Sequence, residues 1–268
     1  MGFLEEIVRA TQRSLADPGY DQGVPSERPR KPSSLRSAIE RDALSGALLV
    51  EYKRVSPGRP DPVLPARSVP SFVASTEAAG VTGYSCLATR PRFDGAPADV
   101  AELVRSTHRP VLFKEFVLDP RQLDVAARAG ASAVLLIARL ETERYLSVPL
   151  RELSRRAHAL GLEVLLEVHA RSELSATSGV EADVIGVNVR DLDSLAIDRP
   201  TGEATLEAAR RSGLHPLLGL SGVESRADAE RFWSRGVDGI LVGSAVARAP
   251  DPREFLSTLR RAAPRGRR

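Results

Sequence analysis

Eight short apolar runs, whose starts lie 20 to 34 residues apart, constrain the fold of this chain more than any other feature. Each run is almost continuously apolar, which is typical of strands buried on both faces of a parallel sheet. The runs are Ala47–Lys53, Val81–Leu87, Pro110–Phe116, Ala133–Ala138, Glu163–Val168, Asp183–Asn188, Pro216–Leu220 and Asp238–Gly243.

Helical patterns separate these runs. Apolar residues recur three and four positions apart in Pro120–Ala129, Val148–Leu160 and Ser225–Ser234, as they do along one face of a helix. Strand–helix alternation repeated eight times predicts an α/β fold, the (β/α)8 TIM barrel. A doubly wound sheet is the alternative, but such a sheet usually carries a G-x-G-x-x-G turn after its first strand, and the sequence has none.

The remaining sequence suggests how the chain is organised around the barrel. Residues 1–45 contain two helical patterns and are too short to have their own core, so we expect an N-terminal helical extension that packs on the barrel. We expect the barrel over residues 46–258 and an Arg-rich tail over residues 259–268. Five prolines fall within residues 54–70, which we interpret as a semi-rigid lid rather than a linker.

Composition excludes several classes of protein. With 42% hydrophobic and 27% charged residues the chain is globular, and its single cysteine, Cys86, excludes an intrachain disulfide framework. No apolar run is long enough to span a membrane and residues 1–6 lack a secretory pattern, so we expect a cytoplasmic protein. The four histidines lack metal-site spacing and aromatic residues make up only 4%, so we expect neither a metal nor a nucleic-acid partner.

Polar residues gather at the ends of the predicted strands. Barrel enzymes place their catalytic groups at the carboxyl ends of the strands. A single polar residue there could simply reach solvent, but several together would converge on one barrel mouth, where lysines and carboxylates shift one another's pKa. The candidates are Glu51, Lys53, Lys114, Glu167, Asn188 and Arg190.

The lysine content supports proton transfer at this mouth. Only three of the 38 Lys and Arg residues are lysines, and two of them, Lys53 and Lys114, lie at or near the ends of predicted strands. A partly buried lysine can release its proton, whereas arginine effectively cannot.

Two Gly/Ser turns follow the last two predicted strands. Barrels often bind phosphate in these two loops, through backbone N–H groups that glycine leaves accessible. The candidate phosphate-binding residues are therefore Ser221, Gly222, Gly243 and Ser244.

Six stretches of the chain resemble the indole-3-glycerol-phosphate synthase family, in the family's order: EYKRVSP (51–57), PVLFKEF (110–116), LLEVH (165–169), IGVNVRDL (185–192), LSGV (220–223) and LVGS (241–244). The resemblance implies a monomeric enzyme of tryptophan biosynthesis that needs no metal or organic cofactor. Its sugar-phosphate substrate would be 1-(2-carboxyphenylamino)-1-deoxyribulose 5-phosphate, which closes a ring and loses CO2 and water to give indole-3-glycerol phosphate.

The resemblance also implies residue roles. Lys114 would be the general acid of ring closure and Glu167 the general base of dehydration. Lys53 would face the anthranilate carboxylate, with Glu51 as its partner. The groups that hold the sugar hydroxyls and the site's charge would be Asn188 and Arg190. Ser56 would join the phosphate site, and the apolar wall around the aromatic ring would be Leu87, Phe93, Phe116, Leu135 and Ile137.

The chain departs from the family pattern at several positions. Leu220 stands where the family usually has Glu, which removes one carboxylate from the barrel mouth, and Glu115 stands where it has Asp. Leu220 motivates an alternative, a phosphate-binding barrel with phosphoribosylanthranilate isomerase-like activity, although Glu51 and Lys53 argue against it. A barrel that only binds a ligand or a partner is a further alternative, which retention of every proton-transfer candidate disfavours.

Overall fold

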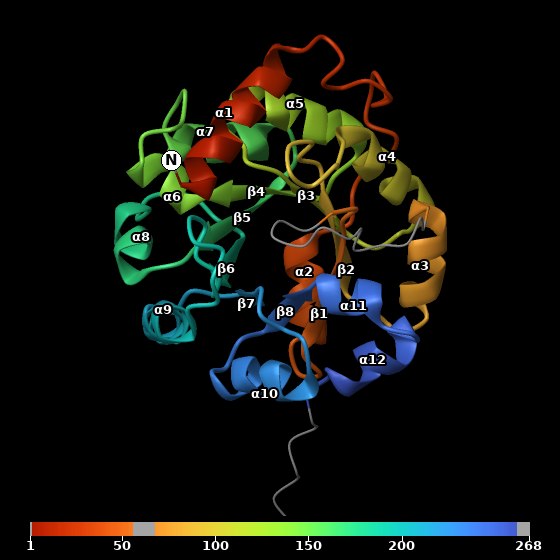
Figure 1. The fold of residues 1–268 in the computed structure, drawn as a ribbon, viewed down its shortest axis with the longest axis vertical. Helices are drawn as coiled ribbons and strands as arrows, with labels where there is room; N and C mark the ends of the chain where they lie inside the picture. The colour runs from red at the N-terminus through yellow and green to blue at the C-terminus, as the bar shows by residue number, and fades with distance from the viewer. Residues whose placement is uncertain (1, 56–67, 262–268) are drawn as a thin grey trace, which may run out of the picture.

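The computed structural model describes residues 2–55 and 68–261, and within them eight parallel strands close into a barrel in sequence order. β8 pairs with β1 and so completes the ring that Figure 1 shows from one end. The predicted (β/α)8 TIM barrel is therefore confirmed. The strands are β1 (Ala47–Tyr52), β2 (Gly83–Leu87), β3 (Val111–Lys114), β4 (Ala133–Ile137), β5 (Glu163–Val168), β6 (Val184–Asn188), β7 (Leu217–Leu220) and β8 (Gly239–Val242).

Helices form the outer ring. The predicted helix Pro120–Ala129 is reproduced as α5, where Asp119 caps the first turn and Gly130, at φ 86°, ends the helix in the left-handed conformation. The other outer helices are α3 (Val69–Glu77), α4 (Pro97–Ser106), α6 (Ala138–Thr142), α7 (Leu150–Ala159), α8 (Arg171–Ala176), α9 (Arg199–Arg211), α10 (Arg226–Ser234), α11 (Ser244–Arg248) and α12 (Pro252–Thr258).

Side chains alternate between two apolar clusters. In β1, Leu48 and Val50 belong to the cluster between the strands and the outer helices, whereas Ala47 and Leu49 belong to the cluster inside the barrel. All of these residues are buried. This two-sided burial explains why the runs lack the alternating pattern of a half-exposed strand.

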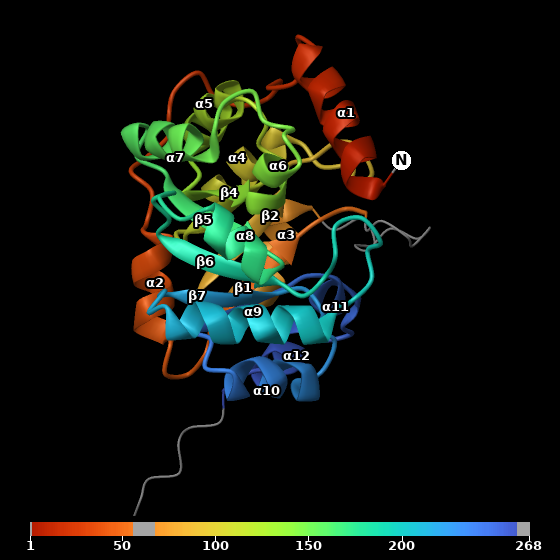
Figure 2. The same ribbon diagram turned by 90° about the vertical axis from the view of Figure 1, so that its left-hand side faces the viewer.

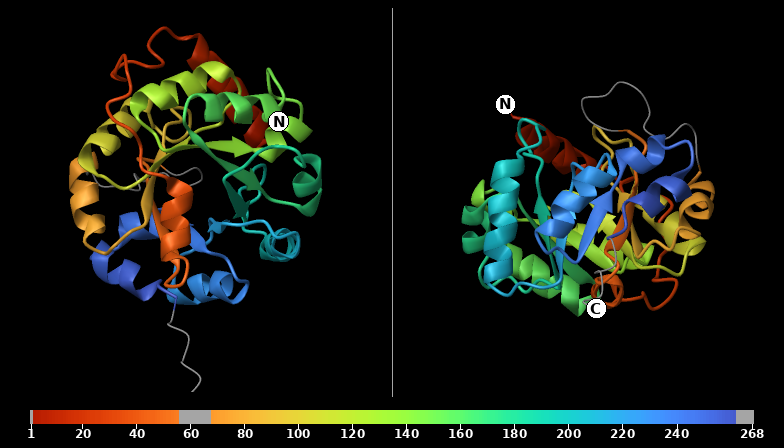
Figure 3. Two further views of the ribbon diagram at one scale, coloured as in Figure 1. Left: turned by 180° about the vertical axis from the view of Figure 1, so that it is seen from behind. Right: turned by 90° about the horizontal axis from the view of Figure 1, so that it is seen from below.

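The two helices of the N-terminal extension lie at opposite ends of the barrel (Figures 2 and 3). Leu35 and Ile39 of α2 (Leu35–Asp42) join the inner cluster at the amino ends of the strands. Leu4 and Ile7 of α1 (Phe3–Ala16) join the same cluster near the carboxyl ends. The extension thus contributes to the barrel core at both ends.

Part of the predicted lid and tail falls outside the described residues, namely 56–67 and 262–268. Within the described part, Leu259 is fully buried and the guanidinium of Arg261 lies 5.2 Å from the ring centre of Trp233. The tail therefore packs against the barrel at least as far as Arg261. Among the described helices, none has the length and apolar character needed to cross a membrane.

Candidate active site

One cavity of about 210 Å³ opens at the carboxyl ends of the strands. It is lined by every described residue that the sequence assigned to the candidate catalytic site, phosphate site and apolar wall, while Ser56 lies outside the described residues. These predicted residues are Glu51, Lys53, Lys114, Glu167, Asn188 and Arg190, then Ser221, Gly222, Gly243 and Ser244, and Leu87, Phe93, Phe116, Leu135 and Ile137.

Glu51 lies between two lysines. Its Oε1 accepts a hydrogen bond of 2.8 Å from Nζ of Lys53, and its Oε2 lies 3.5 Å from Nζ of Lys114. Burial tends to raise the pKa of Glu51, but the two ammonium groups outweigh it and lower that pKa to about 2. Burial likewise tends to lower the pKa of Lys114, but Glu51 and Glu167 raise it above the ordinary lysine value. Lys114 is therefore a protonated donor at neutral pH.

Glu167 is held on one side of this cavity by Asn188. The side-chain amide of Asn188 donates a 2.9 Å hydrogen bond to Oε1 of Glu167, and its oxygen accepts one from the backbone N–H of Arg190. No hydrogen bond from any described residue reaches Oε2 of Glu167, although that oxygen is buried. The second oxygen is thus available to accept a proton from a bound molecule.

The two Gly/Ser turns line the β7 and β8 side of the cavity. Ser221 and Gly222 both have positive φ, at 66° and 70°, which leaves backbone N–H groups accessible in a tight turn. A Cβ at Gly243 would lie 2.7 Å from Oε1 of Glu51 and 3.0 Å from Nζ of Lys53. Glycine at 243 therefore leaves the space that the ion pair occupies.

Aromatic residues form the apolar side. The ring centre of Phe93 lies 6.4 Å from the ring centres of both Phe116 and Phe3. Phe3 comes from α1 and lines the cavity, although the sequence offered no sign of it beyond an apolar position in a helical pattern. Leu220 also lines the cavity, and its side chain fills the space beside Gly186.

Glu115 is a further cavity residue without an assigned role from the sequence. Its buried carboxylate accepts a 2.5 Å hydrogen bond from the hydroxyl of Tyr20, 95 residues away in the chain. Burial raises the pKa of Glu115 to about 7. Other lining residues outside the sequence prediction are Leu192, Leu195, Val223, Glu224, Leu241 and Ala245.

No three His, Cys, Asp or Glu side chains within residues 2–55 and 68–261 are grouped so that they could hold a metal ion. The donor set of the cavity, two lysines, an arginine and carboxylates, instead suits acid–base chemistry on an anionic molecule.

Comparison with known proteins identifies the family. A family model described as indole-3-glycerol phosphate synthase matches residues 4–259. This chain belongs to that family. The indole-3-glycerol phosphate synthases of Staphylococcus aureus strains JH1 and Newman are each 34% identical to it over 264 residues, which is 97% of this chain and 98% of theirs. Membership of the indole-3-glycerol phosphate synthase family places the chain among enzymes of tryptophan biosynthesis.

Solved structures show the same barrel at low sequence identity. Thiamine phosphate pyrophosphorylase from Pyrococcus furiosus is 20% identical with a TM-score of 0.56, covering 82% of this chain and 95% of that one. N-acetylmannosamine-6-phosphate 2-epimerase from Clostridium perfringens is 13% identical with a TM-score of 0.58, covering 76% and 89%. These similarities concern the fold alone.

Proposed function

We propose that the protein converts 1-(2-carboxyphenylamino)-1-deoxyribulose 5-phosphate to indole-3-glycerol phosphate, with loss of CO2 and water. The observation that carries the proposal is the pair of lysines around buried Glu51, which share one cavity with Glu167. Such a site holds a proton donor and a proton acceptor at once.

Ring closure is the first step. The ammonium of Lys114 donates its proton to the substrate's C2 carbonyl oxygen while the ring carbon that bears the carboxylate attacks C2. A C–C bond forms and the carbonyl becomes a hydroxyl. Burial tends to lower the pKa of Lys114, but Glu51 and Glu167 raise it, so Lys114 carries its proton when the substrate binds. Lys53 faces the carboxylate of the substrate.

Loss of CO2 and of water completes the indole. The C–C bond to the carboxylate breaks, and its electron pair restores the aromatic ring, so no cofactor is needed as an electron sink. The new hydroxyl then leaves as water with a proton from Lys53, and Oε2 of Glu167 takes a proton from C1 to form the double bond. Asn188 holds Glu167 in position for this transfer.

The rest of the cavity binds the substrate. Asn188 and Arg190 hold the sugar hydroxyls and the negative charge, and the apolar wall, including Phe93 and Phe116, packs against the anthranilate ring. The phosphate binds at the two turns formed by Ser221, Gly222, Gly243 and Ser244, together with Ser56. We further propose that the enzyme acts in the cytoplasm as a monomer without metal or organic cofactor.

The test is incubation of the protein with this substrate between about pH 6 and pH 9, a range in which general acid–base catalysis can be followed. The expected result is one CO2 and one indole-3-glycerol phosphate for each substrate consumed. Absence of product across the range would refute the proposal.

Leu220 motivates a second candidate function, because the resemblance implies a glutamate at this position of the barrel mouth. A panel that includes phosphoribosylanthranilate would reveal isomerase-like activity. Calorimetric binding of the substrate without turnover would instead favour a barrel that only binds its ligand.

A further inference from the structure

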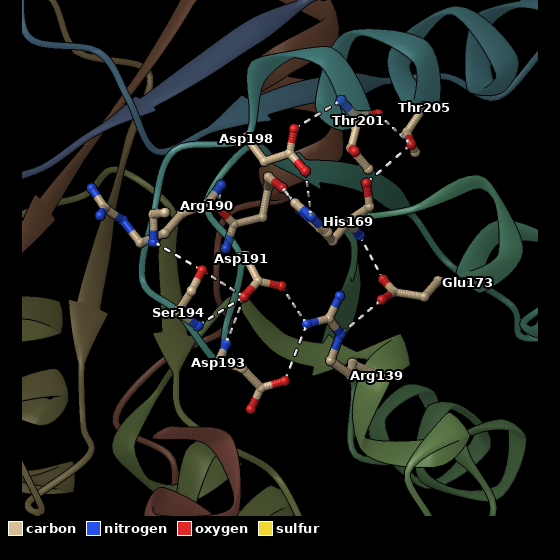
Figure 4. Close-up of polar contacts among 12 residues, drawn as sticks. Arg139, His169, Glu173, Arg190, Asp191, Asp193, Ser194, Asp198, Thr201 and Thr205 are labelled. Atoms are coloured by element: carbon tan, nitrogen blue, oxygen red, sulfur yellow. Dashed lines mark hydrogen bonds and ion pairs between the residues drawn. The ribbon is translucent and has the colours of Figure 1, made fainter. Parts of the chain in front are cut away.

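Arg139 lies behind the cavity, in the first turn of α6 directly after β4, and its side chain is only 14% exposed. Its guanidinium contacts three carboxylates, those of Glu173 and Asp191 and, with 3.6 Å between Nη1 and Oδ2, that of Asp193. Nε donates a 3.0 Å hydrogen bond to Glu173 of α8, and Nη1 donates one of 2.7 Å to Asp191, which follows β6 (Figure 4). Arg139 therefore links the segments that follow β4, β5 and β6.

Asp191 organises the turn that follows it. Its Oδ1 accepts hydrogen bonds from the backbone N–H groups of Asp193 and Ser194 and from the Ser194 hydroxyl, at 2.8 to 3.1 Å. Its other oxygen, Oδ2, faces Arg139. One carboxylate thus connects the backbone of the turn to the arginine behind it.

The turn ends in a conformation that needs such support. Leu195 has φ 58°, in the left-handed region that a leucine rarely adopts, so the surrounding contacts must hold it there. Its carbonyl oxygen accepts a 2.5 Å hydrogen bond from Nη1 of Arg190. Leu195 and Arg190 both line the cavity.

We propose that Arg139 is a positioning residue for Arg190. By holding Asp191 it fixes the turn 191–195, and the Leu195 carbonyl of that turn directs the Arg190 guanidinium into the cavity. Arg139 itself does not line the cavity, so it acts on a bound molecule only through Arg190. The kinetic consequence rests on the proposed function, whereas the geometric consequence does not.

Glu173, the second hydrogen-bond partner of Arg139, is itself held in place by the backbone. Oε2 of Glu173 accepts a 2.6 Å hydrogen bond from the backbone N–H of His169, whose ring Nδ1 lies 2.7 Å from the carbonyl oxygen of Asn188. The anchor of Arg139 on Glu173 is thus itself tied to β6 at Asn188. Glu173 therefore fixes the position from which Arg139 holds Asp191.

The first test is a crystal structure of Arg139→Met beside one of the wild type. We expect the variant to lose the left-handed conformation at Leu195 and the hydrogen bond from Arg190 to its carbonyl, because Asp191 loses its cation. A variant in which both are retained would overturn the proposal. This comparison needs no activity, so it decides the proposal even if the wild type makes no product, a result that would refute only the proposed function.

The second test is a double-mutant cycle on kcat/KM. Arg139→Met should lower kcat/KM about tenfold, mainly by raising KM, but should change it less than about twofold when Arg190→Ala is already present. Equal losses in both backgrounds would show that Arg139 acts on stability or elsewhere, and would overturn the proposal. Arg156→Met, which removes an exposed ion pair with Asp124, is the matched control and should change kcat/KM in neither background.

Asp191→Asn covers the case in which Arg139→Met fails to fold. Its amide oxygen can still accept the hydrogen bonds of the turn, so the change weakens the ion pair between Arg139 and position 191 and leaves the 3.6 Å contact of Arg139 with Asp193 in place. The same dependence on Arg190 is expected. Arg139→Lys should not restore kcat/KM, because one ammonium cannot reproduce the two-sided geometry of a guanidinium, and full activity of the lysine variant would contradict the proposal.

Discussion

Asn188 donates a 2.9 Å hydrogen bond to one oxygen of Glu167, and no described residue donates to the other. Glutamine at position 167 can keep the bond from Asn188 through its amide oxygen but cannot take up a proton. We therefore expect Glu167→Gln to lower kcat by about a thousandfold while KM stays within about threefold. Steady-state formation of indole-3-glycerol phosphate measures both. A kcat near that of the wild type would exclude Glu167 as the base.

Replacing Lys114 with arginine should abolish turnover. Arginine keeps the positive charge facing Glu51 but effectively never releases its proton. We expect Lys114→Arg to lose more than about 99% of kcat, a loss typical of removing a general acid, while calorimetry shows substrate binding retained. Lys31→Arg, the same change at an exposed lysine, is the matched control and should leave kcat unchanged. Normal turnover of Lys114→Arg would contradict the assignment of Lys114 as the acid.

The barrel and most of its mouth could be predicted because both follow from local sequence. A near-continuous apolar run indicates a strand buried on both sides. A polar residue at its carboxyl end, or one position before it, lies at the mouth, as Lys114 and Glu167 do. The predicted run Pro110–Phe116 is longer than the strand, since β3 spans Val111–Lys114.

Contacts between distant segments could not be predicted in this way. Tyr20 meets Glu115 across 95 residues and Arg139 meets Asp191 across 52, and no local period encodes either pair. Phe3 lines the cavity only because α1 lies at the carboxyl end of the barrel. Such residues are determined by where the extension and loops pack, which depends on the whole fold.

Leu220 stands where the family resemblance implies a glutamate, so Leu220→Glu tests whether a carboxylate there would help the enzyme. The leucine is 1% exposed and fills the space beside Gly186, so a charged side chain there would lose apolar contacts and be desolvated. We expect Leu220→Glu to lower the free energy of unfolding by about 2 kcal/mol and to leave kcat no higher than in the wild type. Urea unfolding and the product assay measure the two effects, with Leu220→Gln as the uncharged control. An increase in kcat specific to Leu220→Glu would contradict this expectation and show that a carboxylate at position 220 favours turnover.

Glu163 anchors α2 at the opposite end of the barrel. One carboxylate oxygen accepts a hydrogen bond from the Ser34 hydroxyl, and the other accepts from the backbone N–H groups of Leu35 and Arg36. We expect Glu163→Ala to lower the free energy of unfolding by about 2 kcal/mol, because the N–H groups of Leu35 and Arg36 lose their charged acceptor. Glu40→Ala, which removes an exposed ion pair with Arg36, should change it by less than about 0.5 kcal/mol. Equal effects of the two variants in urea unfolding would contradict this role of Glu163, and kcat should be unchanged in both.

Glu115 should make stability depend on pH near neutrality. Burial raises its pKa from 4.5 to about 7 in the folded protein, so between these values the folded state keeps a proton that the unfolded state has released. The stability contributed by the protonated carboxyl is therefore fully present below pH 4.5 and is lost as the pH rises through about 7. The size of the shift corresponds to a loss of about 3 kcal/mol.

Glu115→Gln removes this titration. We expect the free energy of unfolding of the variant, relative to the wild type, to rise by about 3 kcal/mol between about pH 4.5 and pH 8, in urea titrations at fixed ionic strength. The hydroxyl of Tyr20 donates to the Glu115 carboxylate and so favours its charged form. Tyr20→Phe removes this hydroxyl and should raise the pKa of Glu115 further. That variant should extend the decline in stability to higher pH. A difference between Glu115→Gln and the wild type that does not change with pH would show that Glu115 is ionised throughout this range.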